Sequence, residues 1–340
     1  MLKVEVIMDY LEFWNLMKRV DASSTLNKNN VIEKVKGSLQ EGNPHLYKKW
    51  EENDFNIDSA IFSEHEDNTL LTSVAGVGCV KVVNALIERG ADVNGSGGAL
   101  TPLYEAIIYS NIEVIEIVEI LIKNGAVLKR EVTGYTPLFF AVYSNQVEVV
   151  STLLENVRGI DLNERSSCMR ASTPLSYAIH SRYTECSKTL IKHILLYDPE
   201  AIKPHYVDGH GEMSEFWDNC QDEVKKMQKE KIDGNITFYD ILTSKDENKL
   251  ARYIRNKNIV EVLEESDYKS EFPVYAGEIE NQYQKGIKRG NLLNEGTVRI
   301  QNSDIGGKLP EEICRKVAKY LSNTDIQKLN DSASVFRRPS

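Results

Sequence analysis

The sequence lacks a long apolar run and a surplus of positive charge, and its first residues do not have the pattern expected of a secretory signal. No stretch of about 18 apolar residues occurs in the chain, so nothing in it predicts a membrane-spanning helix. The formal net charge of -10 argues against nucleic acid or an anionic membrane as the main partner, because both require a dense positive face. Lys3, Glu5 and Asp9 interrupt the first residues, whereas a secretory signal needs an unbroken apolar core. We therefore expect neither a membrane nor a nucleic acid among the partners.

Cysteine is scarce and shows no pairing pattern. The five cysteines are scattered and odd in number: Cys79, Cys168, Cys186, Cys220 and Cys314. Lone cysteines in a chain without an export signal are typical of a reducing compartment. We therefore expect a protein of the cytoplasm or the nucleus.

The chain also lacks a recognisable catalytic or metal-binding constellation. His205, His210 and Cys220 are the nearest approach to a metal set, but their spacing is not that of a metal site. Cys186 and Cys220 lie in helical patterns, where cysteine is usually a small core residue rather than a nucleophile. The stretch GADVNGSGG has no lysine of the kind that a phosphate-binding loop carries. We expect no enzyme activity, no catalytic residue, no cofactor and no metal.

What the chain does contain is a repeat. The stretches that begin GALTPLYEAII, GYTPLFFAVY and ASTPLSYAIH share one pattern, and NTLLTSVAGV is a weaker copy. The anchoring threonines are Thr69, Thr101, Thr136 and Thr173, so successive copies are 32, 35 and 37 residues apart. A fixed period of this length indicates a stack of similar structural units.

Each copy predicts a pair of helices. The threonine can cap a helix by accepting hydrogen bonds from free backbone N–H groups, and proline fits the first helical position. Small alanines recur at Ala75, Ala106, Ala141 and Ala178, where helices can approach closely. Gly90 and Gly125 follow the second helix, where a left-handed residue often ends it.

This pattern resembles the ankyrin repeat. The resemblance implies an all-α solenoid with about four repeats in residues 65–198, and a cap or a degenerate repeat in residues 1–64. It departs from the family in lacking the histidine after TPL and in three extra residues in the second copy.

Ankyrin repeats bind proteins with their hairpin tips and the exposed face of each first helix. Carried over to this chain, the resemblance implies a protein target on the concave face. The implied contact residues are Ile108, Tyr109, Val132, Thr133, Tyr135, Tyr143, Met169, Arg170, His180 and Ser181. Three tyrosines and an arginine suit such a surface, because aromatics and Arg dominate binding hot spots. The alternative interpretation is that these residues serve only repeat packing.

The repeat pattern stops after His193, and the remainder reads as helices. SEFWDNCQDEVKKM places Phe216, Cys220, Val224 and Met227 on one helical face. The polar, glycine-containing segment 295–308 reads as a linker. FWDNCQDEVKKM, DILTSKDENKLARYIRN, FPVY and LPEEI together resemble the PRANC arrangement of poxviruses, parasitoid wasps and arthropod-associated intracellular bacteria. We therefore expect a helical PRANC-like region at 199–300 and an F-box-like motif at 301–340.

The tail LPEEICRKVAKYLSNTDIQKLN carries the motif. F-boxes begin with Leu-Pro and dock apolar residues on the Skp adaptor of cullin–RING ubiquitin ligases. The resemblance assigns that role to Leu309, Pro310, Ile313, Val317, Leu321, Ile326 and Leu329. Ile313, Val317 and Leu321 recur every four residues and predict one helical face. The alternative is a terminal cap that packs this stripe onto the helical domain.

Two functions follow from these resemblances. In the first, the chain is a monomeric substrate-recruiting adaptor of an SCF-type ubiquitin ligase. In the second, it is a non-enzymatic decoy that masks a host factor, for example in Rel-type transcription factor signalling. Either function places the protein in the host cell if its source is a pathogen or symbiont.

Overall fold

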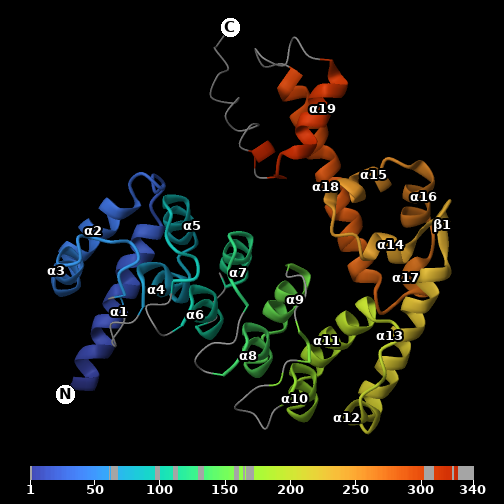
Figure 1. The fold of residues 1–340 in the computed structure, drawn as a ribbon, viewed down its shortest axis with the longest axis horizontal. Helices are drawn as coiled ribbons and strands as arrows, with labels where there is room; N and C mark the ends of the chain where they lie inside the picture. The colour runs from blue at the N-terminus through green and yellow to red at the C-terminus, as the bar shows by residue number, and fades with distance from the viewer. Residues whose placement is uncertain are drawn as a thin grey trace. The chain divides into compact units, whose positions relative to one another are not determined.

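The computed structural model confirms an all-α fold, with ankyrin-type helix pairs followed by a second helical region (Figure 1). It describes residues 2–60, 62, 68–95, 100–109, 114–128, 134–156, 161–163, 165, 172–301, 310–323 and 325–327, with backbone alone for residues 2–10. The chain forms two compact units. The first comprises Met1–His193 with His205–Val207, and the second comprises Ile194–Pro204 with Asp208–Ser340.

Four helix pairs follow three amino-terminal helices. The amino-terminal helices are α1 (Leu2–Asp21), α2 (Val31–Gly42) and α3 (Pro44–Glu51). The pairs are α4 (Leu70–Val77) with α5 (Val80–Arg89), α6 (Pro102–Ile108) with α7 (Val114–Lys123), α8 (Pro137–Tyr143) with α9 (Val147–Asn156), and α10 (Pro174–His180) with α11 (Thr184–Tyr197). A short helix, α12 (His205–Asp208), follows.

The four repeat threonines begin equivalent helices, as predicted. Thr69, Thr101, Thr136 and Thr173 each have an extended backbone, and each side-chain oxygen accepts a hydrogen bond from the backbone N–H three residues later. The four donor–acceptor distances are 3.1, 3.4, 3.1 and 3.2 Å. Threonine satisfies one of the free N–H groups at each helix start, so the same local sequence produces the same local structure four times.

The pairs stack through both their first and second helices. α4 packs on α6, α6 on α8 and α8 on α10, while α5 packs on α7 and α7 on α9. Asn94 links two successive turns, because its amide donates to the Gly125 carbonyl at 3.1 Å and its oxygen accepts from the Val127 N–H at 2.8 Å. Gly125 has a φ of +91°, as its role in ending α7 requires.

Helices α1 and α2 pack against the first pair, and α3 packs against α2. Lys18 donates from Nζ to the Gly78 carbonyl at 3.0 Å, at the end of α4. Asp21 accepts from the Val82 N–H at 3.0 Å, at the start of α5. Both bonds satisfy backbone groups that helix ends leave open. These two bonds link α1 to the first pair.

The second unit is built around one long helix. Its elements are α13 (Gly211–Lys229), β1 (Lys231–Asp233), β2 (Ile236–Thr237), α14 (Phe238–Leu242), α15 (Glu247–Tyr253), α16 (Lys257–Glu265), α17 (Tyr268–Glu271), α18 (Ala276–Gln301) and α19 (Glu311–Tyr320). The strands form a small antiparallel hairpin. α14, α15 and α19 all pack against α18.

The predicted linker at 295–308 is wrong in its first part, because α18 continues to Gln301. Gly296 and Thr297 are buried on this helix. A side chain at Gly296 would come within 3.0 Å of Ile326, so the glycine permits close packing rather than breaking the helix. Residues 302–308 lie outside the described part of the chain.

Candidate protein-interaction surfaces

A connected row of aromatic rings runs along the first helices of the repeats. We name it the aromatic ladder, and its members are Tyr104, Tyr135, Phe139, Phe140, Tyr143, Tyr177 and Tyr183. Neighbouring ring centroids lie 5.0–6.3 Å apart. Ring pairs at this separation attract each other in addition to burying apolar area. The ladder spans three repeats; Tyr104 and Phe139 are buried, Tyr143 is exposed and the other members are half-buried, so only part of it faces solvent.

The structure brings part of the predicted target-binding set together. Tyr135 and Tyr143 stack with their centroids 5.7 Å apart. Tyr109 is exposed at the end of α6, where Gly76 of α4 leaves room for its ring. In the rest of the set, Ile108 and Ser181 are half-buried and His180 is exposed, while Val132, Thr133, Met169 and Arg170 lie outside the described residues.

The sequence interpretation missed Phe140 and Tyr177. The ring centroid of Tyr143 lies 5.9 Å from that of Phe140 and 5.6 Å from that of Tyr177. Both residues are four positions after their repeat threonine. An alignment of the copies by their threonines places these two aromatic residues in equivalent positions, and that recurrence is the signal that could have identified them.

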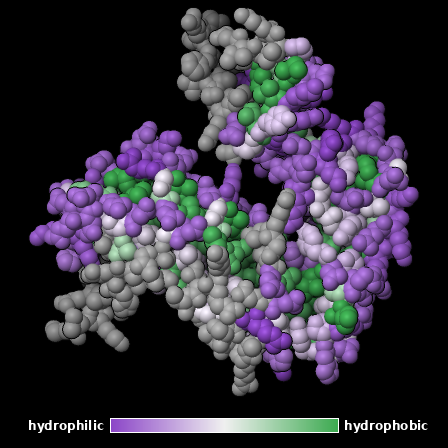
Figure 2. Space-filling view, viewed as in Figure 1, coloured by the Kyte–Doolittle hydropathy of each residue, from purple (hydrophilic) through white to green (hydrophobic). Residues whose placement is uncertain are grey.

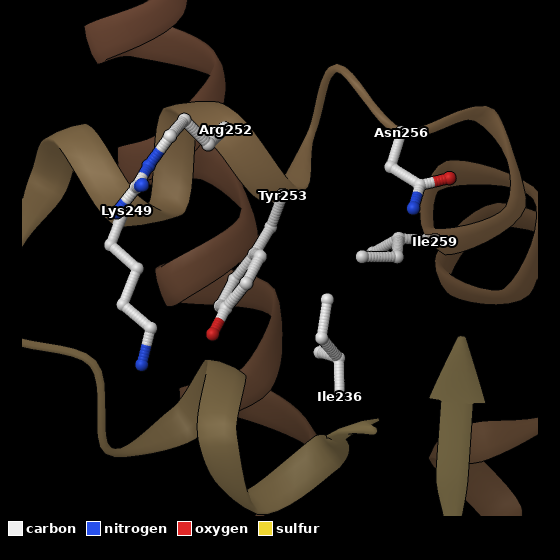
Figure 3. A pocket seen from close by; sticks show the side chains of 6 residues that line it. All are labelled: Ile236, Lys249, Arg252, Tyr253, Asn256 and Ile259. Carbon is white, nitrogen blue, oxygen red and sulfur yellow. The ribbon is translucent and has the colours of Figure 1, made fainter. Parts of the chain in front are cut away.

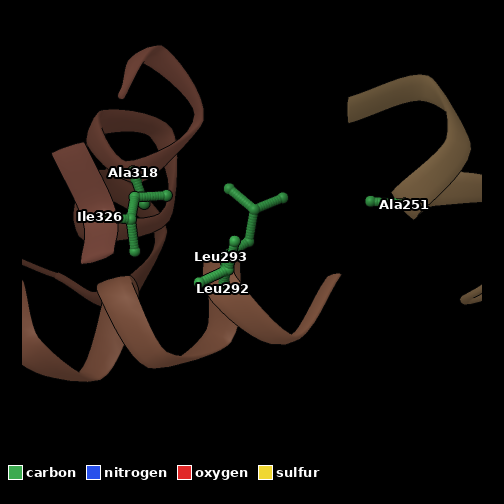
Figure 4. Packing of buried hydrophobic residues seen from close by; sticks show 5 residues of the cluster. All are labelled: Ala251, Leu292, Leu293, Ala318 and Ile326. Atoms are coloured by element: carbon green, nitrogen blue, oxygen red, sulfur yellow. The ribbon is translucent and has the colours of Figure 1, made fainter. Parts of the chain in front are cut away.

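The tail helix α19 has one buried and one exposed face. Cys314 and Ala318 are buried, and they recur every four residues. Ala318 and Ile326 form one core cluster with Leu292 and Leu293 of α18 and with Ala251 of α15 (Figure 4). This face fixes α19 to the unit.

A second stripe of α19, adjacent to the buried one at roughly 100° around the helix, is apolar and exposed. Ile313 is 39% exposed, Val317 is 42% exposed and Tyr320 is 92% exposed. These residues recur at four-residue and three-residue intervals, so they share a helix face. Apolar surface over α19 is visible in Figure 2. Tyr320 was not in the predicted adaptor-binding set, although its position three residues after Val317 places it on the same helix face.

The structure divides the predicted adaptor-binding set. Pro310, Ile313 and Val317 are exposed at and along α19. Leu321 is half-buried against the core, and Ile326 is fully buried. Ile326 thus supports the tail and is not available to a partner, because α18 covers it. Leu309 and Leu329 lie outside the described residues.

Arg289 of α18 holds the end of α19. Its side chain is 3% exposed, and its guanidinium donates to the Leu321 carbonyl at 2.8 Å and to the Lys319 carbonyl at 3.4 Å. It also donates to the side-chain oxygens of Asn323 at 2.7 Å and Asn248 at 3.0 Å. The carbonyls at a helix end have no partner within the helix, so Arg289 satisfies groups that would otherwise be buried without one.

The chain after α19 is fixed by a local cap. The Asp325 carboxylate accepts from the Ser322 hydroxyl at 2.6 Å and from the Ser322 N–H at 3.2 Å. The Asp325 N–H donates back to the Ser322 oxygen at 3.1 Å. This reciprocal pair is a capping box, and it starts the turn that carries Ile326 into the core.

The two cysteines considered as nucleophiles, Cys186 and Cys220, are core residues in this structure, whereas His205 is exposed and His210 is half-buried. Cys186 is buried, and burial raises the pKa of its thiol to about 11, with a smaller contribution from Glu185. A thiol with this pKa is protonated near neutral pH and is a poor nucleophile. Among the described residues, no three His, Cys, Asp or Glu side chains lie close enough to hold a metal ion. Within the same part of the chain, no helix is long and apolar enough to cross a membrane.

Comparison with known families agrees with both units. A family model of ankyrin repeats in three copies matches residues 99–166 and 116–201. A model of the PRANC domain matches residues 233–331, which include both the α14–α18 region and the tail helix α19. No curated protein matches the chain. The chain is therefore an ankyrin-repeat protein with a carboxyl-terminal PRANC domain.

Proposed function

We propose that this protein is a substrate-recruiting adaptor of an SCF-type ubiquitin ligase. Its ankyrin unit binds a target protein, and its tail binds the Skp adaptor. No residue of the chain performs chemistry in this mechanism. The target is held near the ligase, which raises its effective concentration at the site of ubiquitin transfer.

The exposed face of α19 is the observation that carries the proposal. Ile313, Val317 and Tyr320 are exposed although α19 packs firmly on α18 through its other face. A helix that served only as a cap would direct its larger apolar residues inward, whereas here Cys314 and Ala318 face inward. An apolar helix face is one of the recurring ways in which proteins recognise each other.

The aromatic ladder supports the target-binding half of the proposal. Tyr143 is exposed at its edge and contacts the rings of Tyr135, Phe140 and Tyr177. These contacts restrict the rotamers of the rings before any partner arrives, so little side-chain entropy remains to be lost on binding. Aromatic side chains also provide much of the binding energy at protein interfaces.

The test measures binding of purified Skp adaptor to the full-length chain. Ile313→Ala with Val317→Ala is expected to weaken binding by about tenfold or more, because fully burying one such side chain is worth roughly 1.5–3 kcal/mol. Lys316→Ala, at an exposed site on the same helix, is the matched control and is expected to change binding by less than about threefold. Absence of binding by the unmodified chain at micromolar concentration would rule out the ligase function.

The second candidate function is a decoy that masks a host protein without recruiting a ligase. The aromatic ladder favours it equally, since this surface does not involve the tail. The same binding experiment separates the two functions. A chain that captures a target through the ankyrin unit but does not bind the Skp adaptor is a decoy.

A further inference from the structure

A pocket of about 320 Å³ lies in the second unit, remote in sequence from the α19 face. Lys249, Arg252 and Tyr253 of α15 line it together with Asn256, Ile236 of β2 and Ile259 of α16. Its volume is at the lower end of the range found for small-molecule sites. Figure 3 shows the Lys249 ammonium and the Tyr253 hydroxyl extending from α15 to the same side.

Two cations at the pocket have no carboxylate partner in the described part of the chain. The Lys249 ammonium lies 5.5 Å from the centroid of the Tyr253 ring, which attracts it and restricts where it can lie. Arg252 is exposed one helical turn further on. Within the described residues, no ion pair involves either side chain. Figure 3 shows the Lys249 side chain extending away from α15 and the Arg252 side chain running along it, so the two cationic groups lie apart. A bound anion would attract both.

The carboxylates of the neighbourhood are held by neutral amides. Asp233 accepts from Asn256 at 2.6 Å and from Asn258 at 2.9 Å, and these two bonds hold its pKa below the usual value. Glu247 accepts from Asn323 at 2.6 Å. A hydrogen bond from an amide leaves a carboxylate charged, so Asp233 and Glu247 offset part of the positive charge of Lys249 and Arg252 without forming an ion pair with either.

The rest of the pocket is apolar. Ile259 is fully buried, Ile236 is half-buried, and both lie beside the Tyr253 ring (Figure 3). Such a lining favours a ligand that carries an apolar group as well as a charge. An ion as small and as strongly hydrated as inorganic phosphate would leave this lining unused.

We propose that this pocket binds an organic anion, a phosphate ester or a carboxylate attached to an apolar ring. The anion contacts Lys249 and Arg252, whose N–H groups form charge-assisted hydrogen bonds with such oxygens. The ring occupies the space against Tyr253, Ile236 and Ile259. A free metabolite and a modified side chain of a bound protein present the same chemistry to this site.

Calorimetric titration of the full-length chain tests the proposal with phenyl phosphate, benzoate, inorganic phosphate and phenol. Saturable binding of phenyl phosphate or benzoate, with weaker binding of inorganic phosphate and phenol, is the expected result. The preference between the first two probes identifies the anion as an ester or a carboxylate. Lys249→Gln with Arg252→Gln is expected to weaken the binding by about tenfold or more, because two charge-assisted contacts are lost.

Lys257→Gln is the matched control, since Lys257 is an exposed cation near the pocket that does not line it. This variant is expected to bind within about twofold of the unmodified chain, because distant exposed charges are screened by salt. Equal losses in both variants would show a diffuse surface effect and overturn the proposal, as would equal affinity for inorganic phosphate and phenyl phosphate. The absence of saturation by any anion would also overturn it. Skp-adaptor binding should be unchanged in every variant, so the outcome is independent of the proposed ligase function.

Discussion

The repeat helices and the tail helix are both short amphipathic helices, yet they are held in different ways. α6, α8 and α10 each begin with a threonine cap and a proline, and each packs on copies of itself. α19 has Pro310 at its cap position, without a side-chain hydrogen bond to its N–H groups. Its position depends instead on Arg289 and on the core around Ile326. The repeats are thus specified by local sequence, whereas the tail is specified by contacts that are distant in sequence.

The exposed surfaces of the repeats and of the tail also differ in how many elements form and support them. The aromatic ladder is distributed over several helices and supported by ring contacts between repeats. The apolar face of α19 lies on a single helix, and three side chains form it. We therefore expect the ladder to lose function gradually under substitution, and the tail to lose it when one supporting contact is removed.

The largest effect is expected at Arg289. Arg289→Met removes four hydrogen bonds and leaves the Leu321 carbonyl and two asparagine side chains without their partner. A buried acceptor that loses its donor typically costs about 1–3 kcal/mol, and Arg289→Met affects several acceptors at once. The loss should appear as faster amide hydrogen exchange in α19, while exchange in the repeat helices stays unchanged.

Two variants sharpen this first prediction. Lys288→Met changes an exposed neighbour on α18 and is expected to leave exchange in α19 unaltered. Arg289→Lys retains the charge but cannot reach several acceptors at once, so it should restore little protection. Full protection of α19 in Arg289→Met would show that the tail is held by apolar packing alone.

The second prediction separates support from recognition within the predicted adaptor-binding set. Ile326→Ala is expected to destabilise the docked tail by about 2–4 kcal/mol, because it leaves a cavity against Leu292 and Leu293. Ile313→Ala should change stability by about 0.5 kcal/mol or less, since the side chain is partly exposed. Urea unfolding and Skp-adaptor binding of the two variants provide the measurements. Equal stability losses would mean that Ile313 is a core residue in solution.

This division marks what the sequence could and could not reveal. The threonine period predicted where α4, α6, α8 and α10 begin, because capping and proline preference act within a few residues. The four-residue spacing of Ile313 and Val317 predicted a shared face for the same reason. Neither pattern states which side of a helix meets the rest of the protein. Cys314 and Ala318 also recur every four residues, and they form the face that is buried.

Long-range contacts were beyond the reach of this reasoning. Arg289 precedes Leu321 by 32 residues, and nothing local in KRGNLL indicates that this arginine reaches the end of another helix. Gly296 misled the interpretation, since a glycine among polar residues is typical of a linker but here it makes room for Ile326. Phe140 and Tyr177 were an avoidable omission, because the repeat alignment already placed them in equivalent positions.

The third prediction compares one tyrosine from each surface. Tyr143→Ala removes contacts with three rings, and each aromatic pair contributes about 0.5–1.5 kcal/mol, so a loss of about 1.5 kcal/mol or more is expected in the ankyrin unit. Tyr320→Ala should cost about 0.5 kcal/mol or less, because its side chain is almost fully exposed. Denaturant midpoints of the two variants give the comparison. A neutral Tyr143→Ala would mean that the ladder is not a connected cluster in solution.

The smallest effects are expected at the caps, where the two regions can be compared with the same chemistry. Thr136→Ala removes the cap of α8 and should lower the stability of the ankyrin unit by about 1 kcal/mol. Ser322→Ala removes the corresponding oxygen in the tail and should lower protection locally by a similar amount, without moving the unfolding transition of the repeats. Thr136→Ser keeps the acceptor oxygen and is the matched control, with little expected change. In a solenoid each repeat is stabilised by its neighbours, so the loss at Thr136 should extend beyond α8 into α6 and α10. If Thr136→Ala accelerated amide hydrogen exchange in α8 alone, that coupling would be contradicted. A repeat helix would then be as independent of its neighbours as the tail is expected to be.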